Sequence, residues 1–107
     1  MTSDLDRRVF ILEPMKHDLS DACRFGDLVY IYSHDERRPS MWTNAFKEDC
    51  MSRLEQEQFD HERDYFLVGG PTTPVTLIVV HLVLSFDTLN LLLFDSASSE
   101  YRHQMIT

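Results

Sequence analysis

The sequence is poor in the residues that mark specialised classes of protein. Its 107 residues include only two cysteines, Cys23 and Cys50, and because neither belongs to a CxxC pair, a disulfide scaffold and a zinc ribbon are both disfavoured. Both cysteines fall in apolar stripes of helical spacing, so we expect reduced thiols in the core. The longest apolar run, 74–86, carries a histidine in its middle and is too short to span a bilayer. The opening residues lack the basic and apolar segments of an export signal, and we expect a cytoplasmic protein.

Basic residues are also scarce. The chain has 10 Lys and Arg against 18 Asp and Glu, which gives a net charge of −8. Nucleic-acid binding needs clustered Lys and Arg to contact phosphates, so the composition argues against a direct nucleic-acid partner. The same charge favours solubility and is compatible with a basic protein partner.

Signatures of catalysis and of cofactor binding are missing as well. The sequence contains no GxGxxG, GK[ST] or GxSxG motif, and its five histidines show neither HxH nor HxxxH spacing. We therefore expect no metal and no cofactor. The sequence favours a non-enzymatic protein and leaves a small enzyme open.

What is present is a regular alternation of apolar runs and amphipathic segments. Runs of β-branched, aromatic and aliphatic residues predict strands at 7–14, 27–32, 64–68, 89–95 and 100–106. Apolar residues on one helical face predict a short helix at 17–26, which ends at Gly26, and a longer one at 41–59. In the longer helix the apolar stripe consists of Trp42, Phe46, Cys50 and Leu54. The polar segment 33–40 is predicted to be a loop.

Segment 74–86 has two possible structures. Its Val, Ile, Thr and Leu content favours a strand, which could form a hairpin with 89–95. Its length, the Thr72 and Thr73 side chains as possible caps, and Pro74 at the first helical position favour a helix. A crossover between two parallel strands also requires an intervening helix. We expect a helix, apolar nearly all round.

These elements predict one α/β domain over residues 1–107. The order β-α-β-α-β-α-β-β is typical of a Rossmann-like three-layer sandwich with a mostly parallel sheet of four or five strands and one antiparallel edge. The predicted all-apolar helix would need cover on two sides, and a second copy of the chain could supply one. Val79, Leu82 and His81 are therefore candidates for an interface in a homo-oligomer.

A possible ligand site lies at the carboxyl ends of the predicted strands. Gly69 and Gly70 follow one strand and precede the contested helix, where backbone N–H groups and the Thr72 and Thr73 hydroxyls could hold an anion. Three further polar side chains follow other strands and would lie at the same edge: Arg37, Arg38 and Asp95. Pro71 and Pro74 remove two donors from this turn. The alternative is a tight corner that needs its glycines only for their backbone freedom.

Two stretches of the sequence resemble a group of small uncharacterised proteins encoded by tailed bacteriophages. They are "FDHERDYFLVGGP" at 59–71, which leads through the apolar helix to "LNLLLFD", and the opening "RRVFILEPMKHDLSDACRFGDLVYIY" at 7–32. The resemblance covers most of the chain but brings no established activity and no catalytic residues. It implies a protein that acts in the cytoplasm of an infected bacterium.

The sequence therefore predicts a non-enzymatic phage accessory protein that binds a host protein or itself. The alternative is a binder, or a small enzyme, for an anionic or nucleotide-like ligand at the Gly69–Gly70 turn.

Overall fold

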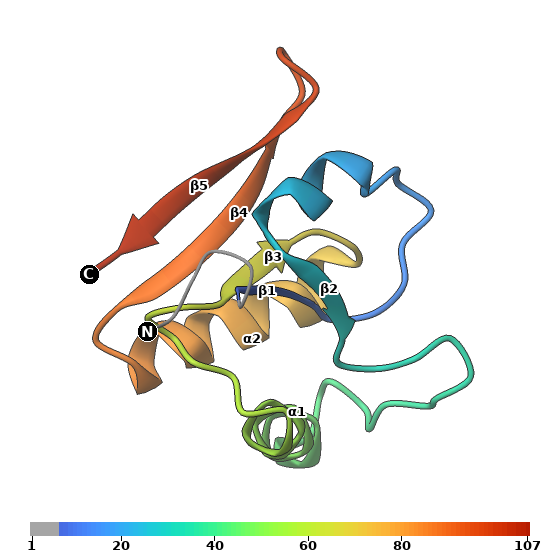
Figure 1. The fold of residues 1–107 in the computed structure, drawn as a ribbon. Coiled ribbons are helices and arrows are strands. Elements are labelled where there is room, and N and C mark those ends of the chain that lie inside the picture. Colours follow the sequence, from blue (N-terminus) through green and yellow to red (C-terminus); the bar gives the residue numbers. More distant parts are fainter. Residues whose placement is uncertain (1–6) are drawn as a thin grey trace.

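The structure, a computed structural model, describes residues 7–107. The chain forms a five-stranded sheet with two α-helices and one 3₁₀ helix (Figure 1). In chain order the elements are β1 (Arg8–Ile11), η2 (Ser20–Phe25), β2 (Asp27–Tyr30), α1 (Asn44–Gln56), β3 (Tyr65–Val68), α2 (Thr72–Ser85), β4 (Leu89–Asp95) and β5 (Glu100–Ile106). The α/β class predicted from the sequence is confirmed.

The sheet has the order β2-β1-β3-β4-β5. β1 pairs in parallel with β2 and β3, β3 pairs in parallel with β4, and β4 forms an antiparallel hairpin with β5. The hairpin has the longest ladder, from Leu89 opposite Ile106 to Asp95 opposite Glu100. The sheet is therefore mixed, which corrects the prediction of a mostly parallel one.

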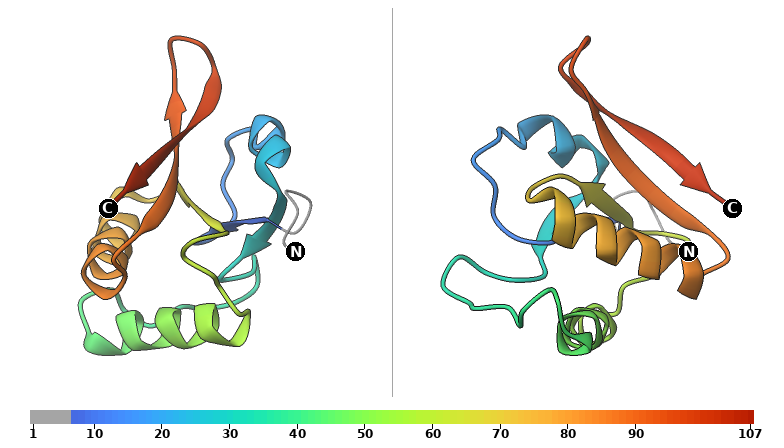
Figure 2. Two further views of the ribbon diagram at one scale, coloured as in Figure 1. Left: turned by 60° about the vertical axis from the view of Figure 1, so that its left-hand side comes forward. Right: turned by 180° about the vertical axis from the view of Figure 1, so that it is seen from behind.

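The helices α1 and α2 lie on the same face of the sheet, and η2 lies on the other (Figure 2). This follows from the strand order. The connections that leave β2 and β3 run across the sheet in one direction, and the connection that leaves β1 runs in the opposite direction. Because crossovers between parallel strands are right-handed, opposite directions place the connecting segments on opposite faces. The second face carries one six-residue 3₁₀ helix and no α-helix among the described residues. The Rossmann-like three-layer sandwich is accordingly not confirmed.

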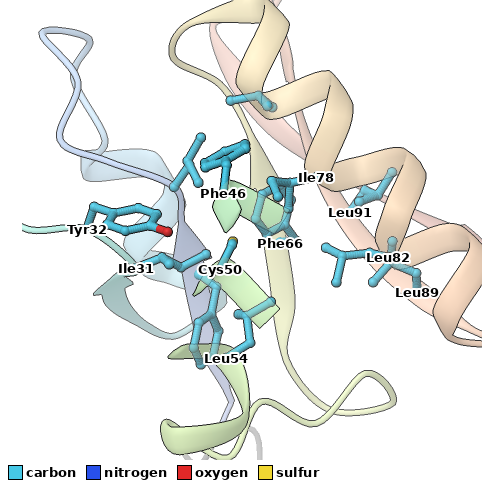
Figure 3. Close-up of a cluster of buried hydrophobic side chains, with 13 residues drawn as sticks. Ile31, Tyr32, Phe46, Cys50, Leu54, Phe66, Ile78, Leu82, Leu89 and Leu91 are labelled. Carbon is cyan, nitrogen blue, oxygen red and sulfur yellow. The ribbon is translucent and has the colours of Figure 1, made fainter. Parts of the chain in front are cut away.

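Helix α1 is shorter than the predicted helix 41–59. Thr43 has an extended backbone at the N-cap position, and its N–H donates to the Ser40 carbonyl, so the helix begins at Asn44. Phe46, Cys50 and Leu54 face the core as predicted (Figure 3). Trp42 precedes the helix and is 77% exposed, which corrects its place in the buried stripe.

Segment 74–86 is helical, as expected, and forms most of α2. The helix begins at Thr72, and its N-cap is Pro71 without a side-chain cap, so neither threonine has the predicted capping role. Pro74 lies in the first turn. Backbone N–H groups there have no acceptor within the helix, so the absence of an N–H on proline costs no helical hydrogen bond. Only one face of α2 is buried, through Pro74, Val75, Ile78 and Leu82.

Both cysteines are free thiols, as predicted. Cys50 is buried in the core between α1 and the sheet. Cys23 is exposed, because η2 turns as a short 3₁₀ helix and buries Ala22 instead. The expectation that Cys23 is a core residue is therefore wrong.

Candidate functional site

The Gly69–Gly70 turn is a tight corner between β3 and α2. Gly70 has a φ of +100°, a conformation that side-chain-bearing residues rarely adopt. A Cβ added at Gly69 would lie 2.9 Å from the Leu67 Cδ2 atom and 3.0 Å from the Met15 Cε atom. The glycines are thus required by backbone conformation and by the close approach of Met15.

Met15 also lies close to the place where a ligand would be expected. The connections from β1 and β3 run in opposite directions, so the crevice outside their carboxyl ends is the usual ligand position in an open α/β sheet. The Met15 side chain follows β1 and lies over both glycines of this turn. The thioether therefore lies beside the turn that was expected to hold an anion.

The other predicted anion ligands have their own partners or lie elsewhere. Arg38 donates from Nε to the Glu13 carboxylate at 3.2 Å and lies over the Phe46 ring, whereas Arg37 is exposed. Asp95 accepts from Arg102 at 2.7 Å on the part of the β4–β5 hairpin that extends beyond β3 (Figure 1). That bond lowers the pKa of Asp95. The structure brings Arg38 to the end of β1 but does not gather the predicted set around the glycines.

A second polar cluster joins the loop 33–40 to α1. The Tyr32 hydroxyl donates to Asp49 at 2.6 Å, and Arg53 donates to both Asp49 and Glu36. The Ser33 backbone N–H, together with Arg53, lowers the pKa of Glu36 to about 2. Burial, reinforced by the bond to Asp49, raises the pKa of Tyr32. These bonds fix the position of the loop.

The segment 60–64 is organised by a buried carboxylate. Asp64 is 0% exposed and accepts hydrogen bonds from the backbone N–H groups of Arg8 and Asp60 and from the guanidinium groups of Arg8 and Arg63. Asn90, also buried, donates to the carbonyls of His61 and Glu62. The sequence signal was an asparagine within an otherwise apolar strand. The role of this network is to join β1, β3 and β4.

The largest exposed apolar side chains on the helical face gather in one groove, which we call the α2 groove. Its volume is about 330 Å³. It is lined by residues 41–44, Phe46 and Lys47 on one side and by Leu77, Val80, His81 and Leu84 on the other. Leu84 is 81% exposed, and Val80 and Leu77 are 52% and 42% exposed. Such a cluster is typical of a surface that binds another molecule.

The interface candidates predicted in α2 divide between the groove and the core. His81 lines the groove. Leu82 is 0% exposed, and Val79 is partly buried against the same core cluster. The exposed apolar residues of α2 are instead Leu77, Val80, Val83 and Leu84, of which all but Val83 line the groove, and Ile78 and Leu82 are buried on the opposite side.

Within residues 7–107 no group of three or more His, Cys, Asp or Glu side chains is placed to hold a metal ion. No helix in this part of the chain is long and apolar enough to cross a membrane.

Comparison with known proteins identifies a family. The sequence model of a family described as "Phage Pam3 gp32-like protein" matches residues 7–107. The resemblance to small phage proteins is thereby confirmed. No curated protein and no solved structure matches the chain.

Proposed function

The chain belongs to the Phage Pam3 gp32-like protein family, and from this premise we propose that it is a non-enzymatic phage accessory protein that acts by binding another protein through the α2 groove. It works in the cytoplasm of the infected bacterium. Its partner is a host protein or a second copy of the chain, without a direct contact to nucleic acid.

The exposure of Trp42 and Leu84 is the observation that carries this proposal. Each leaves more than three quarters of its surface in water, at 77% and 81%, on the two sides of one groove. Burying apolar surface gains about 25 cal/mol for each Å² removed from water. Aromatic residues surrounded by other apolar side chains are also the usual anchors of protein interfaces.

The anion-binding alternative has weaker support. An anion at the Gly69–Gly70 turn would share its surroundings with the apolar Met15 side chain, which lies close to both glycines. It would also compete with Glu13 for Arg38. No observation favours a nucleotide over the tight-corner explanation.

Growth competition between phages tests the proposal. Phages that encode Leu84→Ser and phages that encode the unchanged protein would infect the same culture, and their ratio would be followed by sequencing over successive rounds. We expect the Leu84→Ser phage to be lost, because the variant removes apolar contact area from the groove without changing the core.

The matched control is Met105→Ser. Met105 is 51% exposed on β5, away from the groove, so this variant removes a similar apolar side chain from another surface. We expect its phage to compete equally with the wild type. If the Leu84→Ser phage also persists at a constant ratio, the groove is not the functional surface and the proposal is wrong.

A further inference from the structure

We infer that the partner in the α2 groove is a second copy of the chain, held by antiparallel packing of the two α2 helices about a two-fold axis beside Val80 and His81. This inference rests on the proposed function, because it names the partner of the same surface.

The spacing of the groove residues on α2 is the first argument. Leu77, Val80, His81 and Leu84 lie at successive intervals of three, one and three residues. This pattern is unchanged when the direction of the helix is reversed. Two antiparallel copies therefore place Leu77 opposite the partner's Leu84, and Val80 opposite the partner's His81, at the same time. A two-fold interface requires this kind of self-complementarity.

Charge is the second argument. The chain has a net charge of −8, so most approaches between two copies are repulsive. None of the described residues that line the groove is acidic, and Lys47 is basic. Two copies that meet through this groove bring together surfaces whose described lining carries no carboxylate. A strongly basic partner would gain nothing from a groove that offers no carboxylate.

The exposed area is the third argument. The four exposed apolar side chains of the groove are those of Trp42, Leu77, Val80 and Leu84. At their exposed fractions they leave on the order of 450 Å² in water, which is close to the area of the largest apolar patch on a typical monomer. A stable interface covers about 800 Å² on each partner. The exposed polar residues Thr73, Thr76 and Asn44 lie along or beside the same helix and extend the contact as a rim. Trp42 closes over the partner's helix from the side of α1.

Disulfide cross-linking tests both the partner and the direction of packing. The exposed Cys23 would first be replaced by serine, and the buried Cys50 would be kept. In this background Val80→Cys should form a covalent dimer under mild oxidation, because the two copies of residue 80 lie next to the axis, offset by only about 1.5 Å along the helices. Leu84→Cys alone should not, since its two copies lie about 10 Å apart along the helices, beyond disulfide reach.

The mixed pair gives the decisive result. Leu77→Cys protein with a size tag, mixed with untagged Leu84→Cys protein, should yield only the heterodimer on a non-reducing gel. Ser52→Cys, exposed on α1 outside the groove, is the control for random collisions and should remain monomeric. Sedimentation of the unmodified protein should give twice the mass of 12.6 kDa.

Two results would overturn the inference. A monomeric mass, with no more dimer from Val80→Cys than from Ser52→Cys, would exclude the second copy as the partner. Self-cross-linking of Leu77→Cys and of Leu84→Cys would exclude the antiparallel direction. If the first result occurs while the Leu84→Ser phage is still lost in competition, the proposed function stands with a different partner. If the second occurs, it stands with a second copy that packs in another direction. If that phage persists, the proposed function itself falls.

Discussion

Asp64 is a single residue that stabilises an irregular part of this fold. Its carboxylate is fully buried and accepts hydrogen bonds from two backbone N–H groups and two arginines. A buried charge is stabilised only when it is paired and hydrogen-bonded. Here the pairing fixes the 60–64 turn against β1.

Asp64→Asn should therefore destabilise the protein. The amide has the size of the carboxylate, but it removes the negative charge from beside Arg8 and Arg63. We expect the free energy of unfolding to fall by about 2–3 kcal/mol, measured by urea denaturation. Asp27→Asn, at an exposed carboxylate on β2, is the matched control and should change stability by about 0.5 kcal/mol or less. Equal effects of the two variants would contradict the role of Asp64.

Glu36 should make stability depend on pH in the acid range. Its pKa falls from 4.5 to about 2 in the folded protein, chiefly through the Ser33 N–H and then Arg53. A lowered folded pKa contributes stability above the unfolded value, and this contribution is lost as the pH falls from 4.5 towards 2. Glu36→Gln removes the charge at every pH. The difference in unfolding free energy between wild type and variant should therefore shrink across that window, and a difference independent of pH would contradict the assignment.

At the scale of elements, the strand-to-helix corner at Gly70 depends on its backbone conformation. A φ of +100° is strained for any residue with a side chain. Gly70→Ala should cost about 1–2 kcal/mol of stability, seen as a lower urea midpoint. Thr72→Ala, two residues later and exposed, should have a small effect. If Gly70→Ala unfolds at the wild-type midpoint, the turn tolerates a side chain and the structural explanation fails.

The elements also show what sequence patterns can predict. The apolar runs locate all five strands, and the Phe46, Cys50 and Leu54 spacing locates α1, because burial against a sheet imposes these periods. Patterns were less informative at the ends of the helices. Trp42 continues the apolar period of α1 but lies outside the helix. The helix begins only at Asn44, because the backbone of Thr43, between these two residues, is extended. The same periodicity gave no indication that η2 would be a 3₁₀ helix.

The surroundings of the candidate site are set by contacts between residues far apart in the sequence, and a local sequence pattern does not predict such contacts. The sequence located Gly69 and Gly70 correctly in a tight turn, but only the tertiary structure places Met15 over them. Similarly, an almost wholly apolar α2 gives no periodic signal to separate its two faces. Which residues point outward is decided by the sheet beneath the helix and by the direction of the crossover.

At the scale of the whole molecule, the two sides of α2 should give opposite results for the same substitution. Leu82 is 0% exposed in the core, and Leu84 is 81% exposed in the groove. Leu82→Asp buries an unpaired charge among apolar side chains, a cost of several kcal/mol that a domain of this size does not survive. Leu84→Asp places the charge in water and leaves the monomer folded.

Circular dichroism and sedimentation together test this contrast. Leu82→Asp should lose its helical signal or become insoluble. Leu84→Asp should keep the wild-type spectrum and sediment as a monomer, because in the proposed dimer its carboxylate would be buried against the partner's Leu77 in each half of the interface. A folded Leu82→Asp protein would contradict the orientation of α2 on the sheet. A Leu84→Asp protein with an unchanged dimeric mass would show that two copies associate through another surface.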